Sequence, residues 1–240
     1  MRRVGAALAA LMACCSPFGA SDSAGDASAP DVATPTDGGI PLSGGRPCPP
    51  GTFASFCDDF DDALDLPRFY KVVKNGNNAT ASLVNDGLSA PRAVKFSLDT
   101  SLKDDFHRLR LETQEKPSSV RVDVSLRFLK QLPVAPVDLF SIVDKNGSVV
   151  TFSYDGSKYK SSTFAVKIDP STSAGKWIRW TLLTDGASMT LSMDGMPLGT
   201  VTLAEHHTLE DFAFAFGLGA SQPGQNVDVE YDDIAVLLLR

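Results

Sequence analysis

The sequence predicts an all-β fold made of two packed antiparallel sheets, and three of its features carry that prediction. Apolar and polar residues alternate along many short segments, most cleanly where Val120, Val122, Val124, Leu126 and Phe128 alternate with Arg121, Asp123, Ser125 and Arg127. Asn-Gly and Asp-Gly pairs, which favour tight hairpin turns, separate several of these segments. No long amphipathic helix is visible. Short strands with turn signals between them are typical of a β-sandwich.

Residues 1–13 have the pattern of an export signal. Arg2 and Arg3 precede an apolar run from Val4 to Ala13, which is shorter than the roughly 20 residues needed to span a bilayer core. The segment Leu11-Met12-Ala13-Cys14 resembles the lipobox of bacterial lipoproteins. That resemblance implies cleavage before Cys14 and a lipid on its sulfur. A secretory signal cut nearer Ala20, leaving a soluble product, is the alternative.

The residue after Cys14 is a second cysteine rather than an aspartate. In the better-known bacterial sorting rule, this resembles an outer-membrane or extracellular-surface destination in the cell envelope. The lipid anchor would then be the protein's sole contact with the membrane. The net charge of −7 argues against nucleic acid as a partner, because a phosphate backbone attracts basic proteins.

Residues 14–47 form a predicted disordered linker. The stretch 21–39 is built from Ser, Ala, Asp, Pro, Gly and Thr with almost nothing to bury, a composition that cannot offset the entropy of ordering. Residues 48–240 form the predicted folded domain. At its start, Cys48 and Cys57 are an isolated pair, and in an exported protein such a pair predicts a disulfide. No Cys-x-x-Cys motif or nearby histidine favours a metal or redox role instead.

The predicted strands follow in order along the domain. Val94, Phe96 and Leu98 alternate with polar residues, and Val137–Val143 is apolar on both faces, which predicts a strand in the middle of a sheet or beneath a covering loop. Phe164, Val166 and Ile168 form another inward row, and so do Phe212, Phe214, Phe216 and Leu218.

Residues 177–203 predict three strands joined by two hairpin turns. Asp185-Gly186 and Asp194-Gly195 mark the turns, as expected for type I′ geometry, in which both central residues have positive φ. Ile178, Trp180 and Leu182 share one face, and Arg179 and Thr181 face the other way.

The last strand changes its pattern in the middle. Apolar residues occupy odd positions from Val227 to Tyr231 and even positions from Ile234 to Leu238. This change of parity across Asp232-Asp233 predicts a bulge or bend there, because one extra residue reverses the faces of the strand.

The strand–turn–strand pattern of residues 177–203, with its Met-Asp-Gly turn, resembles the laminin G-like and concanavalin A-like jelly-roll domains. The resemblance covers about Cys48 to Leu239. It implies a two-sheet jelly roll whose first and last strands are neighbours, and a binding function more often than catalysis.

Related carbohydrate-binding jelly rolls hold a structural Ca²⁺ between an N-terminal acidic turn and a C-terminal Asp-Asp-Ile. The resemblance therefore implies a calcium site formed by Asp59, Asp61, Asp232 and Asp233, since calcium prefers several hard oxygen ligands. The alternative is that these acids are solvated surface charges and turn caps.

The predicted function is that of a non-catalytic cell-surface lipoprotein whose jelly-roll module binds a glycan or a partner protein. Trp177 lies on the outward parity beside Arg179, and with Arg121 and Arg127 it forms the candidate ligand-binding set. A cationic patch of this kind would prefer an anionic glycan, whereas solvated strand faces explain the same residues. A purely structural envelope protein is a further possibility.

The alternative function is that of a polysaccharide-cleaving glycoside hydrolase of the laminarinase type. Asp228, Glu230 and Asp232 have the spacing of that family's Glu-x-Asp-x-Glu motif, but the acid types are exchanged and the strand is the last one. Glu205 with His206 and His207 is more consistent with a solvated loop than with a metal site, since neighbouring residues on an extended chain point to opposite sides. No catalytic residue is therefore assigned.

Overall fold

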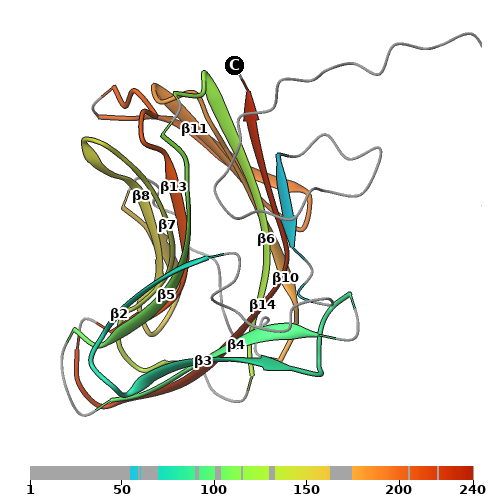
Figure 1. The fold of residues 1–240 in the computed structure, drawn as a ribbon, viewed down its shortest axis with the longest axis vertical. Coiled ribbons are helices and arrows are strands. Elements are labelled where there is room, and N and C mark those ends of the chain that lie inside the picture. Colours follow the sequence, from blue (N-terminus) through green and yellow to red (C-terminus); the bar gives the residue numbers. More distant parts are fainter. Residues whose placement is uncertain are drawn as a thin grey trace, which may run out of the picture. The chain divides into compact units, whose positions relative to one another are not determined.

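In the part of the chain that the computed structural model describes, fourteen strands form two antiparallel sheets (Figure 1). The structure describes residues 55–58, 60, 70–89, 92–100, 104–114, 116–129, 133–162, 175–204, 206–220 and 222–239. All of them belong to one compact unit, Gly38–Arg240. The predicted all-β sandwich is therefore confirmed.

Sheet A has the strand order β12-β11-β10-β6-β14-β4-β3, and β1 also pairs with β14. Its strands are β1 (Phe56–Asp58), β3 (Ala79–Val84), β4 (Ala93–Thr100), β6 (Ser119–Phe128), β10 (Ile178–Thr184), β11 (Ser188–Met193), β12 (Met196–Thr202) and β14 (Gln225–Leu239).

Sheet B has the strand order β2-β5-β13-β7-β8-β9. Its strands are β2 (Lys71–Asn75), β5 (Phe106–Glu112), β7 (Val137–Asp144), β8 (Gly147–Tyr154), β9 (Tyr159–Ser161) and β13 (Ala213–Ala220). Strand β7 lies inside this sheet, as the sequence predicted, but only its inward face is wholly apolar, because Asp138 and Ser141 lie on its outward face.

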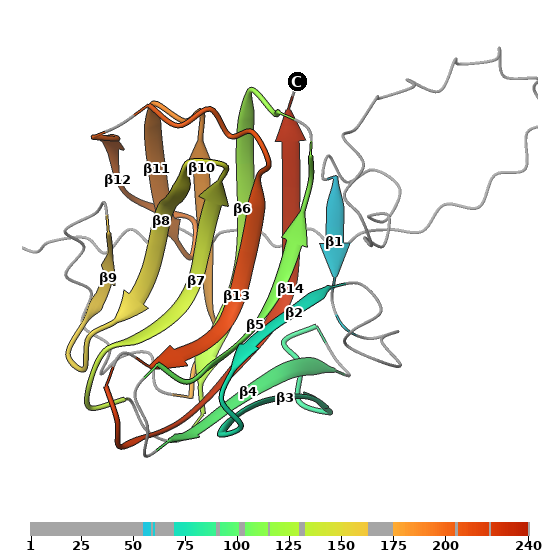
Figure 2. The same cartoon turned by 60° about the vertical axis from the view of Figure 1, so that its left-hand side comes forward.

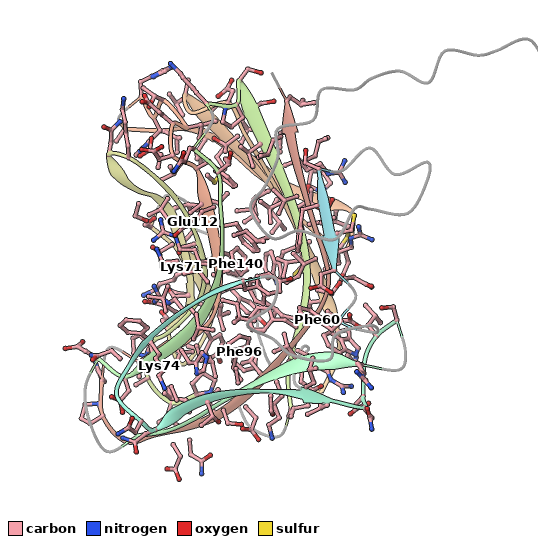
Figure 3. The ribbon with its side chains drawn as sticks, in the orientation of Figure 1. Phe60, Lys71, Lys74, Phe96, Glu112 and Phe140 are labelled. Carbon is pink, nitrogen blue, oxygen red and sulfur yellow. The ribbon has the colours of Figure 1, made fainter. Side chains whose placement is uncertain are left out.

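The inward rows of both sheets meet in an aromatic-rich core. Phe140 stacks on Phe152 with ring centroids 4.6 Å apart, and Phe152 packs against Trp180 at 4.5 Å. Figure 3 shows Phe60, Phe96 and Phe140 between the sheets, whereas Lys71 and Glu112 lie on the outer side of sheet B. Each large apolar side chain buried in this way contributes about 1.5–3 kcal/mol to folding.

Strand β14 carries the predicted bulge. Its register with β6 shifts between Asp232 and Ala235, and Asp233 has a φ of +48°. Ile234 and Val236 beyond the bulge are buried. The bulge therefore keeps apolar residues on the core side along the whole strand.

The first and last strands are neighbours, as the resemblance implied. In β1, Phe56 pairs with Val236 and Asp58 pairs with Ile234. The Asp58 carboxylate accepts hydrogen bonds from the Phe60 amide and the Tyr70 hydroxyl, both at buried positions. Asp58 thus caps the turn after β1 on the core side of the sheet.

The hairpins joining β10, β11 and β12 are present, but their turns differ. Asp194 and Gly195 both have positive φ, as expected for type I′ geometry. At the first turn only Gly186 does. There the Asp185 carboxylate instead accepts the amides of Ala187 and Ser188, which closes a longer loop.

Several predictions fall outside the described residues. These are the signal at residues 1–13, the linker at 14–47, the lipid anchor Cys14, the disulfide partner Cys48 and the inward row at Phe164, Val166 and Ile168. In the described part of the chain, no helix is long and apolar enough to cross a membrane.

Candidate functional site

The outer face of sheet B is concave. Its strands curve, and the hollow of the curve lies on the side away from β6, β10 and β14 (Figure 1). Figure 2 shows this sheet from its outer side, with β13 at its centre between β7 and β5. We use "concave face" for the outward residues of its five neighbouring strands, which include Lys71, Phe106, Arg108, Arg110, Glu112, Asp138, Ser141, Thr151, Ala213, Ala215 and Gly219.

Strand β13 supplies a floor of very small side chains to this face. Its bulky Phe214 and Phe216 point into the core, whereas Ala213, Ala215 and Gly219 point outward. All three are buried, Ala213 at 0% and Ala215 at 6% exposure, so this floor lies beneath longer outward side chains of the neighbouring strands.

Strand β13 contains a bulge at the Gly219 end of this floor. The register with β7 shifts between Phe216 and Gly219, and Gly217 has a φ of +145°. A Cβ at Gly217 would lie 2.2 Å from the His107 carbonyl oxygen, so this position requires glycine. Across the core, the Tyr231 hydroxyl contacts the carbonyl oxygens of Leu139 (2.7 Å) and Gly217 (2.8 Å). Sheet A thereby holds the bulge of sheet B.

Arg108 crosses the floor from β5 to β7. Its Nη2 donates to Asp138 Oδ2 at 2.9 Å, and its guanidinium carbon lies 5.4 Å from the Phe106 ring centroid. Burial raises the pKa of the Asp138 carboxyl, and the guanidinium of Arg108 opposes that shift.

Glu112 holds two further cations on the same side. Its Oε1 lies 3.2 Å from Lys71 Nζ and 2.9 Å from Arg110 Nε. Lys71 is directly opposite Arg110 in the register of β2 and β5. Both Glu112 and Arg110 keep about a third of their side chains exposed, at 34% each.

The predicted ligand-binding residues lie on the other outer face, that of sheet A. Arg121 is bound by Asp123 through Nε and Nη2, at 3.0 and 3.2 Å. Arg179 Nη2 lies 4.0 Å from the same carboxylate. Arg121 and Arg179 point outward, as their parity predicted, but both are arranged around the Asp123 carboxylate rather than in an unpaired patch.

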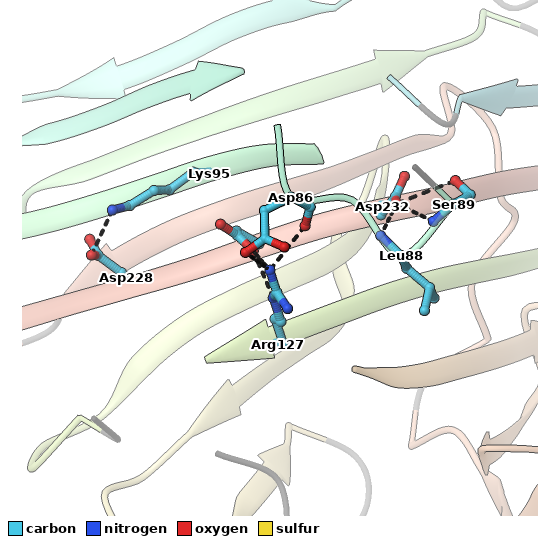
Figure 4. Close-up of polar contacts among 8 residues, drawn as sticks. Asp86, Leu88, Ser89, Lys95, Arg127, Asp228 and Asp232 are labelled. Atoms are coloured by element: carbon cyan, nitrogen blue, oxygen red, sulfur yellow. Dashed lines mark hydrogen bonds and ion pairs between the residues drawn. The ribbon is translucent and has the colours of Figure 1, made fainter. Parts of the chain in front are cut away.

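Arg127 and Trp177 meet in the same face. The Arg127 guanidinium carbon lies 4.7 Å from the Trp177 ring centroid, and its Nε donates to Glu230 Oε2 at 2.7 Å. Arg127 also bonds to Asp86, through the carbonyl oxygen at 2.9 Å and through the carboxylate (Figure 4). One face of the Trp177 ring is thus covered by the Arg127 guanidinium, which is held by one oxygen of Glu230 and two of Asp86.

The three acids of the proposed hydrolase motif are also engaged. Lys95 Nζ lies 2.7 Å from Asp228 Oδ2, and Arg127 binds Glu230, whose pKa is raised by burial against the effect of that arginine. Asp232 Oδ2 accepts the amides of Leu88 and Ser89 at 2.7 and 3.0 Å (Figure 4). Part of sheet A's outer face is consequently closed, and Asp232 is 0% exposed.

The predicted calcium ligands are only partly described. Asp59 and Asp61 lie outside the described residues. Asp232 has its carboxylate committed to backbone amides, including that of Asp233, so this residue does not fit a metal ligand well. Among the described residues, no group of three or more His, Cys, Asp or Glu side chains could hold a metal ion. Calcium remains a prediction that depends on Asp59 and Asp61.

Sequence reasoning missed Arg108, Arg110, Glu112 and Asp138. A signal was present, because residues 106–112 alternate outward polar or aromatic side chains with His107, Leu109 and Leu111. Ala213, Ala215 and Gly219 likewise alternate with bulky residues. What the pattern does not contain is the strand order that brings β5, β13 and β7 together.

No protein-family model matches the chain, and no curated protein sequence is significantly similar to it. Solved structures do match. The cellulose-induced protein Cip1 is 15% identical with a TM-score of 0.57, covering 75% of this chain and 96% of its own. A sialidase is 12% identical with a TM-score of 0.54, and the match covers 75% of this chain but 18% of the sialidase. At these identities, the likeness shows the two-sheet sandwich fold alone.

Proposed function

We propose that this chain is a non-catalytic glycan-binding module of the bacterial cell surface, and that the glycan lies along the concave face. The observation that carries the proposal is the low floor of Ala213, Ala215 and Gly219 between two rims of polar and charged side chains. Ligand sites are concave, with small or apolar groups at their centre and a few polar groups placed around them, and the concave face has this composition.

The flanking groups are of the kinds that bind sugars. Arg108 and Arg110 supply several N–H donors on one rim. On the other rim, Ser141 and Thr151 face each other across β7 and β8. Phe106 adds an aromatic ring, half-buried, at the end of the floor.

The concave face is favoured over the outer face of sheet A. There, Arg121 and Arg127 each bind a carboxylate through two nitrogens, and the loop at Leu88 and Ser89 closes over Asp232. A ligand on that face would have to break these contacts.

The alternative of a glycoside hydrolase gains no support from the geometry. Asp228 and Glu230 are ion-paired, and Asp232 is buried beneath backbone amides. An acid–base pair needs carboxyls that can reach a substrate. Binding without cleavage is the function that these contacts support best.

The proposal includes the tether predicted from the sequence. Lipid at Cys14 would anchor the protein in the outer membrane or at the extracellular surface, and residues 14–47 would link the module to it. The proposed disulfide between Cys48 and Cys57 would fasten the start of the module beside β1. Labelling with radioactive palmitate, lost in Cys14→Ser, tests the anchor separately.

A polysaccharide microarray tests the function. We expect affinity for at least one glycan class and no release of reducing sugar from that glycan. Failure to bind any polysaccharide would refute the proposal, and steady release of reducing sugar would make the protein an enzyme.

A further inference from the structure

Cations gather on the concave face although the chain as a whole is acidic. The outward side chains of β2, β5, β13 and β7 include three cations, Lys71, Arg108 and Arg110, against two acids, Glu112 and Asp138. The formal charge of the whole chain is −7. A local excess of positive charge therefore stands on the surface that we propose to bind a glycan.

The two acids hold the arginines without using up their donors. Arg108 reaches Asp138 through Nη2, and Arg110 contacts Glu112 through Nε. Among the described residues, the two terminal nitrogens of Arg110 donate no hydrogen bond, and Arg108 donates only through Nη2, to Asp138. This differs from Arg121 and Arg127 in sheet A, whose Nε and Nη2 both bind carboxylates.

The three cations lie close together on two neighbouring strands, so that they can face several acidic groups of one ligand. Arg108 and Arg110 are two residues apart on β5 and point to the same side, so their backbones are about 7 Å apart. Lys71 stands opposite Arg110 on β2, and its side chain is 64% exposed. Lys71 and Arg110 therefore line one rim of the floor, and Arg108 lies across it above Gly219.

The guanidinium nitrogens that donate no hydrogen bond indicate which chemical group of a ligand this face would bind. The terminal nitrogens of a guanidinium form a planar fork that binds a carboxylate with two parallel hydrogen bonds. Arg110 presents such a fork, and Glu112 restrains its other end, which lowers the entropy lost when a ligand binds.

We infer that the concave face binds a glycan that carries carboxylate groups, with Arg110 holding one carboxylate and Arg108 and Lys71 adding positive charge on the same face. This inference rests on the proposed function. It adds the ligand class, an acidic polysaccharide built with uronic acids, and the residue that recognises the acid.

The test compares each acidic polysaccharide with its own neutral form. Polygalacturonate, polyglucuronate and hyaluronan are printed beside their carboxyl-reduced derivatives, and dextran sulfate beside dextran. We expect binding to a polyuronate to be at least about tenfold tighter than to its reduced form, because a charge-assisted bidentate contact is lost. The affinity should also fall as salt is raised.

Arg110→Gln is the deciding variant, with Lys95→Gln on the outer face of sheet A as the matched control, since Lys95 is also paired with an acid. Arg110→Gln should weaken polyuronate binding by about tenfold or more and leave any binding to the reduced form unchanged, whereas Lys95→Gln should leave both unchanged. Circular dichroism and thermal unfolding of each variant check the fold.

The outcomes separate the inference from the proposed function. Equal affinity for polyuronates and their reduced forms would overturn the inference and keep glycan binding. A preference for dextran sulfate over every polyuronate would overturn the carboxylate assignment. Unchanged polyuronate binding by a folded Arg110→Gln variant would overturn the role of Arg110, and binding to none of the glycans would remove the proposed function as well.

Discussion

The guanidinium of Arg108 passes directly over Gly219. A Cβ at position 219 would lie 3.0 Å from Arg108 Nη2 and 3.2 Å from Phe106 Cβ. Arg108 can reach Asp138 on β7 because the intervening strand has no side chain at this point. One glycine in β13 thus determines how an arginine of β5 lies on the concave face.

Gly219→Ala should displace Arg108 and weaken glycan binding several-fold while changing the free energy of unfolding by less than about 1 kcal/mol. The clash falls mainly on the flexible end of a side chain, so the fold can adjust. Calorimetric titration with the bound glycan and urea unfolding measure the two effects. Unchanged affinity would mean that the position of Arg108 does not matter for binding.

Gly217→Ala serves as the contrast. There the added Cβ would meet the backbone oxygen of His107 at 2.2 Å, and φ is +145°. We expect a variant that unfolds at much lower denaturant concentration or is not exported as folded protein.

Tyr231→Phe should destabilise the protein by about 1–2 kcal/mol, because two buried carbonyl oxygens lose the hydroxyl that they share. Tyr231 joins the sheets at the bulge of β13. Urea unfolding of the variant should show a lower midpoint with an unchanged slope. An unchanged midpoint would show that the hydroxyl does not link the sheets in solution.

Trp177→Ala should cost about 0.5–1 kcal/mol of stability through loss of its contact with Arg127. Glycan affinity should stay as in the parent protein, because Trp177 lies on the outer face of sheet A. Loss of affinity in a folded variant would instead place the site at Trp177, Arg179, Arg121 and Arg127, as the sequence predicted.

Asp232 should make the protein more stable as the pH falls from about 6 towards 4. Burial raises the pKa of this carboxyl from 3.8 to about 6, so in this window the folded state binds a proton that the unfolded state lacks. The gain is present below the unfolded pKa and is lost as the pH rises through the folded pKa; it amounts to at most about 3 kcal/mol.

Thermal unfolding between pH 4 and pH 7 measures this effect. Burial also raises the pKa values of Asp138 and Glu230, and these shifts likewise stabilise the protein at lower pH. The test is therefore whether the dependence of stability on pH is weaker in Asp232→Asn than in the parent protein. Asp99→Asn, at an exposed position of β4, is the control. An identical slope in Asp232→Asn and the parent would refute the assignment.

Much of the fold could be predicted from local pattern. The apolar residues of the last strand change parity across Asp232-Asp233, and they can all face the core only if one extra residue is inserted there. The structure has the bulge at this position. The alternation from Val120 to Phe128 and the turn at Asp194-Gly195 were equally local signals, and each corresponds to a feature of sheet A.

The site could not be predicted in the same way. Whether Arg108 lies beside Asp138 or elsewhere depends on β13 lying between β5 and β7, and residues 106, 138 and 219 are far apart in the chain. The outward parity of Arg121 and Arg127 was correct. Their pairing with Asp123 and Glu230, however, depends partly on the register of β6 with β14, which periodicity does not specify.

The central claim is that a glycan lies on the concave face of sheet B. Hydrogen–deuterium exchange of the full chain, with and without a polysaccharide that binds it, tests this most directly. We predict slower exchange in residues 106–112 and 213–219, with no change in residues 121–127 and 177–184. Protection confined to residues 121–127 and 177–184, or none at a saturating concentration, would contradict the claim.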